Sequence, residues 1–352
     1  MTTVDGPDRF QRRHVWAGFP LGVVYKYFDD FGTYLAAILT YYAFVSLFPL
    51  LLIASTVLSV VLRGDTRLQH ELLTSALTQF PVVGQELGKP EHLSGGTSGL
   101  VIGIAGSIYG SLGVAQAFQY ASNTMWGIPR NSRPNPLKAR GRSVVLLVTA
   151  GLAVLATTLL SVASAGGVGA LGTVAKYLAI AVSVLINIGV SIFAFRFAPA
   201  RRLSFRDVFP GAAASAIIWQ LLQSFGVLYV RHVVRHASAT NAVFAIVLGL
   251  VAYLFIAAIA ILLCIEINVV RVDRMHPRAL LTPFTDDVPL TQGDKRAYTG
   301  QAKAQRSKGF ERIKVDFTAP DADGESSPGQ ADPEPGQADP EPGQAGPREE
   351  SG

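Results

Sequence analysis

The sequence predicts an all-α membrane protein, a polytopic six-helix transmembrane bundle followed by a disordered C-terminal tail. Only 16% of its 352 residues are charged, whereas about a quarter is usual in a soluble protein. Six stretches contain no Asp, Glu, Lys or Arg, and each exceeds the roughly 18 residues that a spanning helix needs. They are 31–62, 92–129, 143–175, 177–195, 208–230 and 236–265. Buried helices of a soluble protein explain one or two such runs, but not six in series.

These runs divide the chain into three parts. Residues 1–30 form a polar N-terminal segment, 31–275 form the transmembrane domain, and 276–352 form a tail. The first apolar run is too long for the h-region of a signal peptide, so we expect it to remain as a spanning helix. Cys264 is the single cysteine, which excludes an internal disulfide and a thiolate metal cluster.

The distribution of Lys and Arg predicts the orientation. The connections at 130–142, 196–206 and 271–278 are rich in basic residues, and the connections on the opposite side have fewer. Basic connections stay on the cytoplasmic side of a membrane. We therefore expect a multi-pass protein of the plasma (inner) membrane with both termini in the cytoplasm.

The first span contains an unusual polar face in the stretch LAAILTYYAFVSLFPLLL. Tyr42, Ser46 and Pro49 are spaced i, i+4 and i+7, so they share one face of a helix. Pro49 has no N–H, and the carbonyl of Val45 therefore loses its partner. Lipid cannot supply another donor, but a neighbouring helix or a trapped water can. This face is expected to point into a bundle or a cavity.

Amide side chains continue this pattern on three other spans. The candidate cavity residues beyond the first span are Gln116, Gln119, Asn123, Asn187, Gln220 and Gln223. A single amide usually forms an interhelical hydrogen bond that contributes about 0.6 kcal/mol. Polar stripes on four spans exceed what packing needs and favour a shared, solvated cavity, with interhelical bonding as the alternative.

A glycine stripe marks the second span. Gly103, Gly106, Gly110 and Gly113 are spaced 3, 4 and 3, which places them on one side of a helix. Small residues at such spacing let another backbone approach closely. We interpret the stripe as a packing surface, and a flexible gate is the alternative.

No predicted span carries a charged residue near its centre. Glu266 follows the last run and is a candidate for a structural ion pair with an arginine such as Arg196 or Arg201. Arg231 and Arg235 are spaced i, i+4 where the fifth span ends, which suits contact with an anionic headgroup or simple interfacial anchoring.

The region after the last span is polar. Residues 295–314 are basic and are expected either to touch anionic lipid or to be solvated. The sequence PGQADPE then occurs twice in tandem, at 328–334 and 335–341. A Pro/Gly/Gln/Ala repeat with acidic residues cannot bury a core, so we expect it to be disordered.

Three stretches resemble the YihY/BrkB family of bacterial inner-membrane proteins. They are DDFGTYLAAILTYYAFVSLFPLLL, QAFQYASNTMWGIP and LVAYLFIAAIAILLCIEIN. The resemblance covers about residues 20–275 and implies six helices. The family often ends its last span in Gly-Ala-Glu; here Glu266 matches, and Cys264 and Ile265 stand at the two small positions.

Members of that family have carried the label ribonuclease BN. Nuclease chemistry with two metals needs clustered ligands, but no His-x-His occurs and the six uncharged runs hold no acidic residue. His232 and His236 are spaced for a metal but have no evident third ligand. We therefore expect no catalytic residue, metal, cofactor or nucleic-acid partner.

The leading functional hypothesis is movement of a small or amphipathic, lipid-like solute through an uncharged polar cavity. A structural or scaffold role in the envelope is the alternative, and enzymatic activity is third. Membrane lipids are the expected partners.

Overall fold

The computed structural model describes residues 5–61, 96–165, 169–232, 239–285 and 288–317, and all regular structure within them is helical. Six long helices dominate. They are α3 (Gly32–Val61), α5 (Gly96–Met125), α6 (Pro136–Ala165), α7 (Gly169–Phe197), α8 (Phe205–His232) and α9 (Ala239–Val272). Each long helix contains most of one uncharged run. Such a run is too apolar to stay in water, and in lipid a helix satisfies its backbone hydrogen bonds internally. Even α8, with 28 residues, is about 42 Å long, more than the roughly 30 Å hydrocarbon core.

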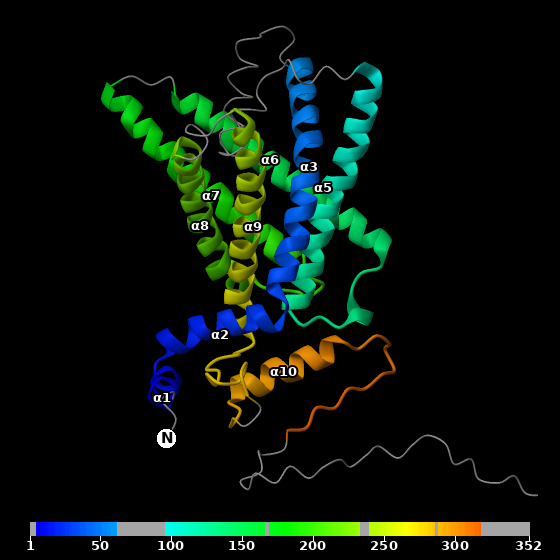
Figure 1. The fold of residues 1–352 in the computed structure, drawn as a ribbon, viewed down its shortest axis with the longest axis vertical. Helices are drawn as coiled ribbons and strands as arrows, with labels where there is room; N and C mark the ends of the chain where they lie inside the picture. The colour runs from blue at the N-terminus through cyan, green and yellow to red at the C-terminus, as the bar shows by residue number, and fades with distance from the viewer. Residues whose placement is uncertain (1–4, 62–95, 166–168, 233–238, 286–287, 318–352) are drawn as a thin grey trace, which may run out of the picture. The chain divides into compact units, whose positions relative to one another are not determined.

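The six long helices pack in a closed order. Each contacts the next along the chain, from α3 through α5, α6, α7 and α8 to α9, and α9 returns to α3. Helix α9 also contacts α5 and α2 (Val15–Asp29), and lies between α3 and α8 in Figure 1. Helix α9 therefore has the most packed position, and its buried residues include Leu262, Ile265 and Val269.

Three helical segments are long and apolar enough to cross a membrane, counted only within the described residues. They are Pro136–Leu160, Tyr177–Phe197 and Val247–Val272, and Gly32–Ser46 is a shorter apolar helix. Of the most apolar stretch in each segment, 17%, 11% and 44% of the residues are buried. The sides of α6 and α7 are thus largely uncovered by protein, as expected for helices that face lipid.

Close packing of α8 on α9 depends on a glycine that the sequence analysis did not single out. The N–H of Gly211 donates to Asn268 Oδ1 over 2.8 Å. A Cβ atom added at Gly211 would lie 2.0 Å from the carbonyl oxygen of Cys264. The small residue at this contact is therefore on α8, opposite the Cys264 and Ile265 positions where the family often has small residues on the last span.

A layer of shorter helices covers one end of the long helices. Helix α2 crosses that end, α1 (Asp5–Arg13) packs on α2, and α10 (Gln292–Ala304) lies nearby (Figure 1). The fully buried Arg278 joins the layer, pairing with Asp29 at 2.9 Å and Asp294 at 2.5 Å. Burial lowers the pKa of the Arg278 guanidinium, but the carboxylates of Asp29 and Asp294 together raise it by more than burial lowers it. The net shift of the pKa is therefore upward.

Residues 295–314 are more ordered than a basic tail would be. Helix α10 starts with a capping box, in which the Thr291 hydroxyl accepts a hydrogen bond from the Asp294 N–H. Ala297 is buried, and the compact unit that contains the long helices extends to Phe317. The PGQADPE repeat lies outside the described residues.

Candidate functional site

A cavity with both apolar and polar lining residues lies between α3, α5 and the start of α6. Its volume is about 350 Å³, and its lining includes the predicted residues Tyr42, Gln116, Gln119 and Asn123. The structure thus brings together four of the nine residues expected at a cavity or kink. Gln116, Gln119 and Asn123 share one face of α5 at i, i+3 and i+7, and this face lines the same cavity as Tyr42 of α3.

The polar face of α3 packs directly on the glycine stripe of α5. A Cβ atom added at Gly113 would lie 2.2 Å from the ring of Tyr42, and one at Gly110 would lie 2.8 Å from the Cα of Ser46. Any side chain there would overlap α3. Gly110 and Gly113 therefore let α3 and α5 approach closely and set the position of Tyr42.

Two lining residues also bond neighbouring segments. Gln119 Nε2 donates to Ser143 Oγ over 2.8 Å and to the Ala139 carbonyl over 3.1 Å, which connects α5 to α6. Asn123 Oδ1 accepts from the Ala200 N–H over 2.8 Å, which connects α5 to the α7–α8 loop. By contrast, Gln116 is exposed to the cavity and makes no hydrogen bond within the described residues.

The cavity is not entirely uncharged, because Arg133 also lines it. Its Nε donates to the Ile128 carbonyl over 3.1 Å, and its guanidinium lies 5.1 Å from the centre of the Tyr120 ring. The loop after α5 turns back at Gly127, whose φ of +59° suits glycine. The cation therefore reaches the cavity from a loop, a position that span composition does not reveal.

The other predicted residues do not line this cavity. Asn187 is half-buried on α7, Gln220 is exposed on α8, and Gln223 is half-buried on α8. The Ser46 hydroxyl donates to the Ala43 carbonyl over 2.9 Å, and therefore does not serve the Val45 carbonyl. The side chain of Pro49 lies outside the described residues, as do the surroundings of Gly103 and Gly106 and the side chains of Arg231 and Arg235.

A buried charge cluster lies where α2 crosses α9. It consists of Lys26, Asp30 and Glu266, which are 4%, 5% and 0% exposed. Lys26 Nζ donates to Asp30 and, over 3.3 Å, to the Met125 carbonyl. Glu266 lies beside Lys26 and Asp30, and no donor within the described residues reaches either of its carboxyl oxygens.

The surroundings of the cluster shift the pKa values of Asp30 and Lys26, which lie outside the spans. Burial raises the pKa of Asp30 more than the neighbouring Lys26 lowers it. Burial alone lowers the pKa of Lys26, but the carboxyl groups of Asp30 and Glu266 raise it more. The net direction of the pKa shift is therefore upward for both Lys26 and Asp30.

The two arginines expected near Glu266 bond other groups within the described residues. Arg201 forms a two-bond ion pair with Asp273, at 2.9 Å for each bond, and Arg196 Nε donates to the Leu203 carbonyl over 3.0 Å. Arg196 lies at the end of α7 and Arg201 in the α7–α8 loop, whereas α2, which contacts α9, carries Lys26. The i, i+4 spacing of Lys26 and Asp30 was the available sequence signal.

Comparison with known proteins identifies the family. The family model described as "Virulence factor BrkB" matches residues 23–286. The chain belongs to the BrkB virulence factor family. No curated protein and no solved structure matches it. The resemblance found in the sequence is thereby confirmed.

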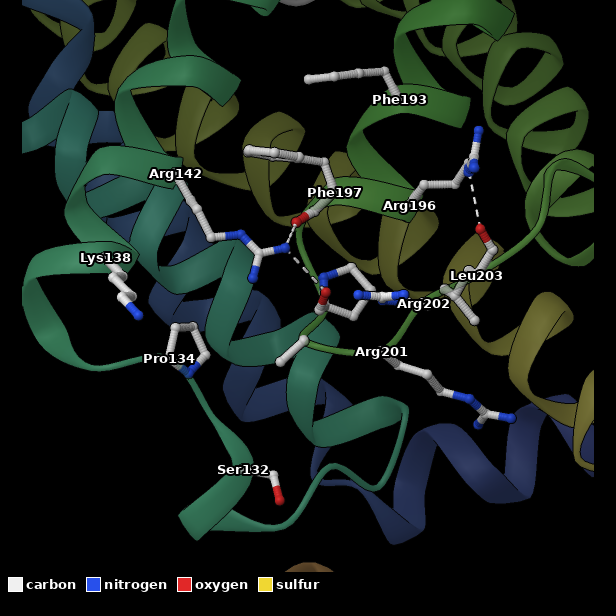
Figure 2. A pocket seen from close by; sticks show the side chains of 12 residues that line it. Ser132, Pro134, Lys138, Arg142, Phe193, Arg196, Phe197, Arg201, Arg202 and Leu203 are labelled. Atoms are coloured by element: carbon white, nitrogen blue, oxygen red, sulfur yellow. Dashed lines mark hydrogen bonds between the residues drawn. The ribbon is translucent and has the colours of Figure 1, made fainter.

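This BrkB-family protein has a second pocket that sequence reasoning missed. It has a volume of about 750 Å³ and lies between the start of α6, the end of α7 and the α7–α8 loop (Figure 2). The pocket is basic, since five of its lining residues are cations: Lys138, Arg142, Arg196, Arg201 and Arg202. These cations come from two basic segments far apart in the chain, 130–142 and 196–206. The basic composition of each segment was the only sequence feature that pointed to the pocket.

Arg142 organises the basic pocket. Its Nη2 donates to the Phe197 carbonyl and, over 3.2 Å, to the Pro199 carbonyl, and its guanidinium lies 4.9 Å from the centre of the Phe197 ring. These bonds satisfy carbonyl groups at the end of α7. In this BrkB-family protein, no group of three or more His, Cys, Asp or Glu within the described residues is arranged to hold a metal ion.

Proposed function

We propose that this BrkB-family membrane protein moves a small or amphipathic solute across the plasma (inner) membrane. The observation that carries the proposal is the cavity of about 350 Å³ lined by Tyr42, Gln116 and Asn123. A cavity of 300–1,000 Å³ suits a small ligand or the polar head of a larger one. Polar groups inside a bundle of apolar helices are costly unless they serve a solute or one another.

The proposal includes a six-span arrangement with both termini in the cytoplasm. Its support is that the three basic connections meet at one end of the helices. Arg142 at the start of α6 bonds carbonyl groups at the end of α7, and Arg201 of the next loop pairs with Asp273 after α9. Basic loops at one end agree with the positive-inside rule. No enzymatic activity is part of the proposal.

A scaffold role is the second candidate, and a specific observation favours it. Gln119 and Asn123, two of the polar lining residues, form hydrogen bonds between segments. Such bonds hold helices together whether or not a solute passes. The two functions therefore differ in what they require of Gln116, which has no bonding role within the described residues.

The test compares strains of the native host that differ at one position. Lipid and metabolite profiles are measured with the gene deleted, restored as wild type, or restored as Gln116→Leu. Thr149→Val is the matched control, because the Thr149 hydroxyl only bonds the Val145 carbonyl of its own helix, over 2.8 Å. Protein levels in the membrane are measured in parallel.

Transport predicts that deletion changes the level of one solute class, that Gln116→Leu reproduces the change at normal protein level, and that Thr149→Val does not. Leucine keeps the volume of the side chain but removes the amide from the cavity. Full restoration by Gln116→Leu, or identical profiles with and without the gene, would put the scaffold function ahead.

A further inference from the structure

The basic pocket has more positive charge than the protein neutralises. Among the described residues that line it, none is Asp or Glu. Asp273, outside the lining, pairs with Arg201. The side chains of Lys138 and Arg202 are exposed and make no hydrogen bond or ion pair within the described residues. Lys138 and Arg142 enter from α6 and Arg196 from α7 (Figure 2).

One wall of the same pocket is apolar. Phe193 and Phe197 stack with ring centres 5.1 Å apart, and both line the pocket. Beyond Arg142 along α6, Val145, Val148 and Leu152 are 43%, 55% and 61% exposed. These residues belong to a helix that is largely uncovered by protein. The cations therefore lie at the foot of a surface suited to acyl chains.

We propose that the basic pocket binds the phosphate headgroup of an anionic phospholipid. Arginine pairs well with phosphate because its fork of N–H groups matches two oxygens. Basic pockets between membrane helices on the cytoplasmic side bind such headgroups. The apolar wall favours a phosphate attached to acyl chains over a free phosphate. The binding site does not depend on transport, and its test reads binding alone.

The experiment measures melting of the full-length protein in a nonionic detergent at increasing ligand concentration. The probes are dioctanoyl phosphatidylglycerol, dioctanoyl phosphatidylcholine and inorganic phosphate. A ligand that binds only the folded state stabilises it by RT ln(1 + L/Kd), where L is the free ligand concentration, so the melting temperature rises with ligand concentration and with affinity. We expect phosphatidylglycerol to stabilise the wild type more than the other two probes at equal concentration.

Two double variants separate the pocket from general surface charge. Lys138→Gln with Arg202→Gln removes the two unpaired cations of the pocket, and both positions are exposed, so folding is retained. Arg140→Gln with Arg206→Gln is the matched control, because these cations are also exposed, lie in the same segments and do not line the pocket.

The pocket variant should weaken binding of phosphatidylglycerol roughly 25-fold, at roughly fivefold for each charge lost near an anionic headgroup. The control variant should change it less than about twofold, since its charges lie outside the pocket and salt screens them from the headgroup. Equal weakening by both variants would overturn the site in favour of surface attraction. Equal stabilisation by inorganic phosphate and phosphatidylglycerol would overturn the lipid as its occupant.

Discussion

The close approach of α3 and α5 gives a sharp test of the packing. In Gly110→Ala the new Cβ atom would lie 2.8 Å from the Cα and 2.9 Å from the Cβ of Ser46. Carbon atoms pack best at about 3.5–4.0 Å, so the two helices must separate by several tenths of an ångström. The obstacle is backbone, which cannot rotate away as a flexible side chain can. We therefore expect the full cost of overpacking.

Overpacking costs about 1–3 kcal/mol, and alanine recovers about 0.8–1 kcal/mol of helix propensity. The net expectation for Gly110→Ala is a loss of up to about 2 kcal/mol. Gly189→Ala on α7 is the matched control, because no atom lies within 4 Å of its added Cβ. It should gain about 0.5–1 kcal/mol from propensity alone.

The assay is unfolding by sodium dodecyl sulfate from mixed micelles, followed by circular dichroism, with both variants and the wild type. The two variants should differ by the overpacking cost of about 1–3 kcal/mol in unfolding free energy, with the wild type between them. If Gly110→Ala were as stable as Gly189→Ala, the helices could not be in contact at Gly110. The account of Tyr42 as a residue positioned by Gly113 would then fail with it.

Lys26→Met should cost about 3–5 kcal/mol by leaving buried carboxyl groups without their cation, and Asp30→Asn should cost less, both measured by the same unfolding assay. Burial raises the pKa of Asp30 in the folded state above 3.8. The contribution of Asp30 to the unfolding free energy is therefore complete below pH 3.8 and is lost as the pH rises through the raised pKa. Asp30→Asn should weaken this dependence of the unfolding free energy on pH. Truncation after Asp316 should leave the melting temperature unchanged, whereas truncation before Arg278 should lower it. A periplasm-dependent reporter fused at Pro136 should be inactive, and activity there would reverse the orientation.

The helices and one helix contact were predictable because they depend on local pattern. Uncharged runs locate the six long helices, since lipid and a packed core both exclude charge. The glycines of α5 and the polar face of α3 are each visible at helical spacing, and the structure places Gly113 against Tyr42. Periodicity reveals which residues share a face, and it does so for each helix separately.

Contacts between distant segments were not predictable from one sequence. Lys26 and Glu266 lie close together only because α2 crosses α9. No local sequence pattern predicts that these two helices cross. Arg278 and Asp29 are similarly remote in the chain. Helix α10 begins with a capping box from Thr291 to Asp294 that the sequence analysis did not consider, because the basic residues around it favoured a solvated stretch.

The polar residues of the cavity show why residue type alone does not separate transport from scaffolding. Asn123 lines the cavity, but its Oδ1 also holds the loop that contains Arg201 and Arg202 through the Ala200 N–H. Removing that amide would alter the cavity and the loop together, and any loss of function would have two causes. Gln116 lines the same cavity and makes no hydrogen bond within the described residues. Its substitution therefore changes the cavity wall while the helix contacts remain, which makes Gln116 the residue that discriminates between the two functions.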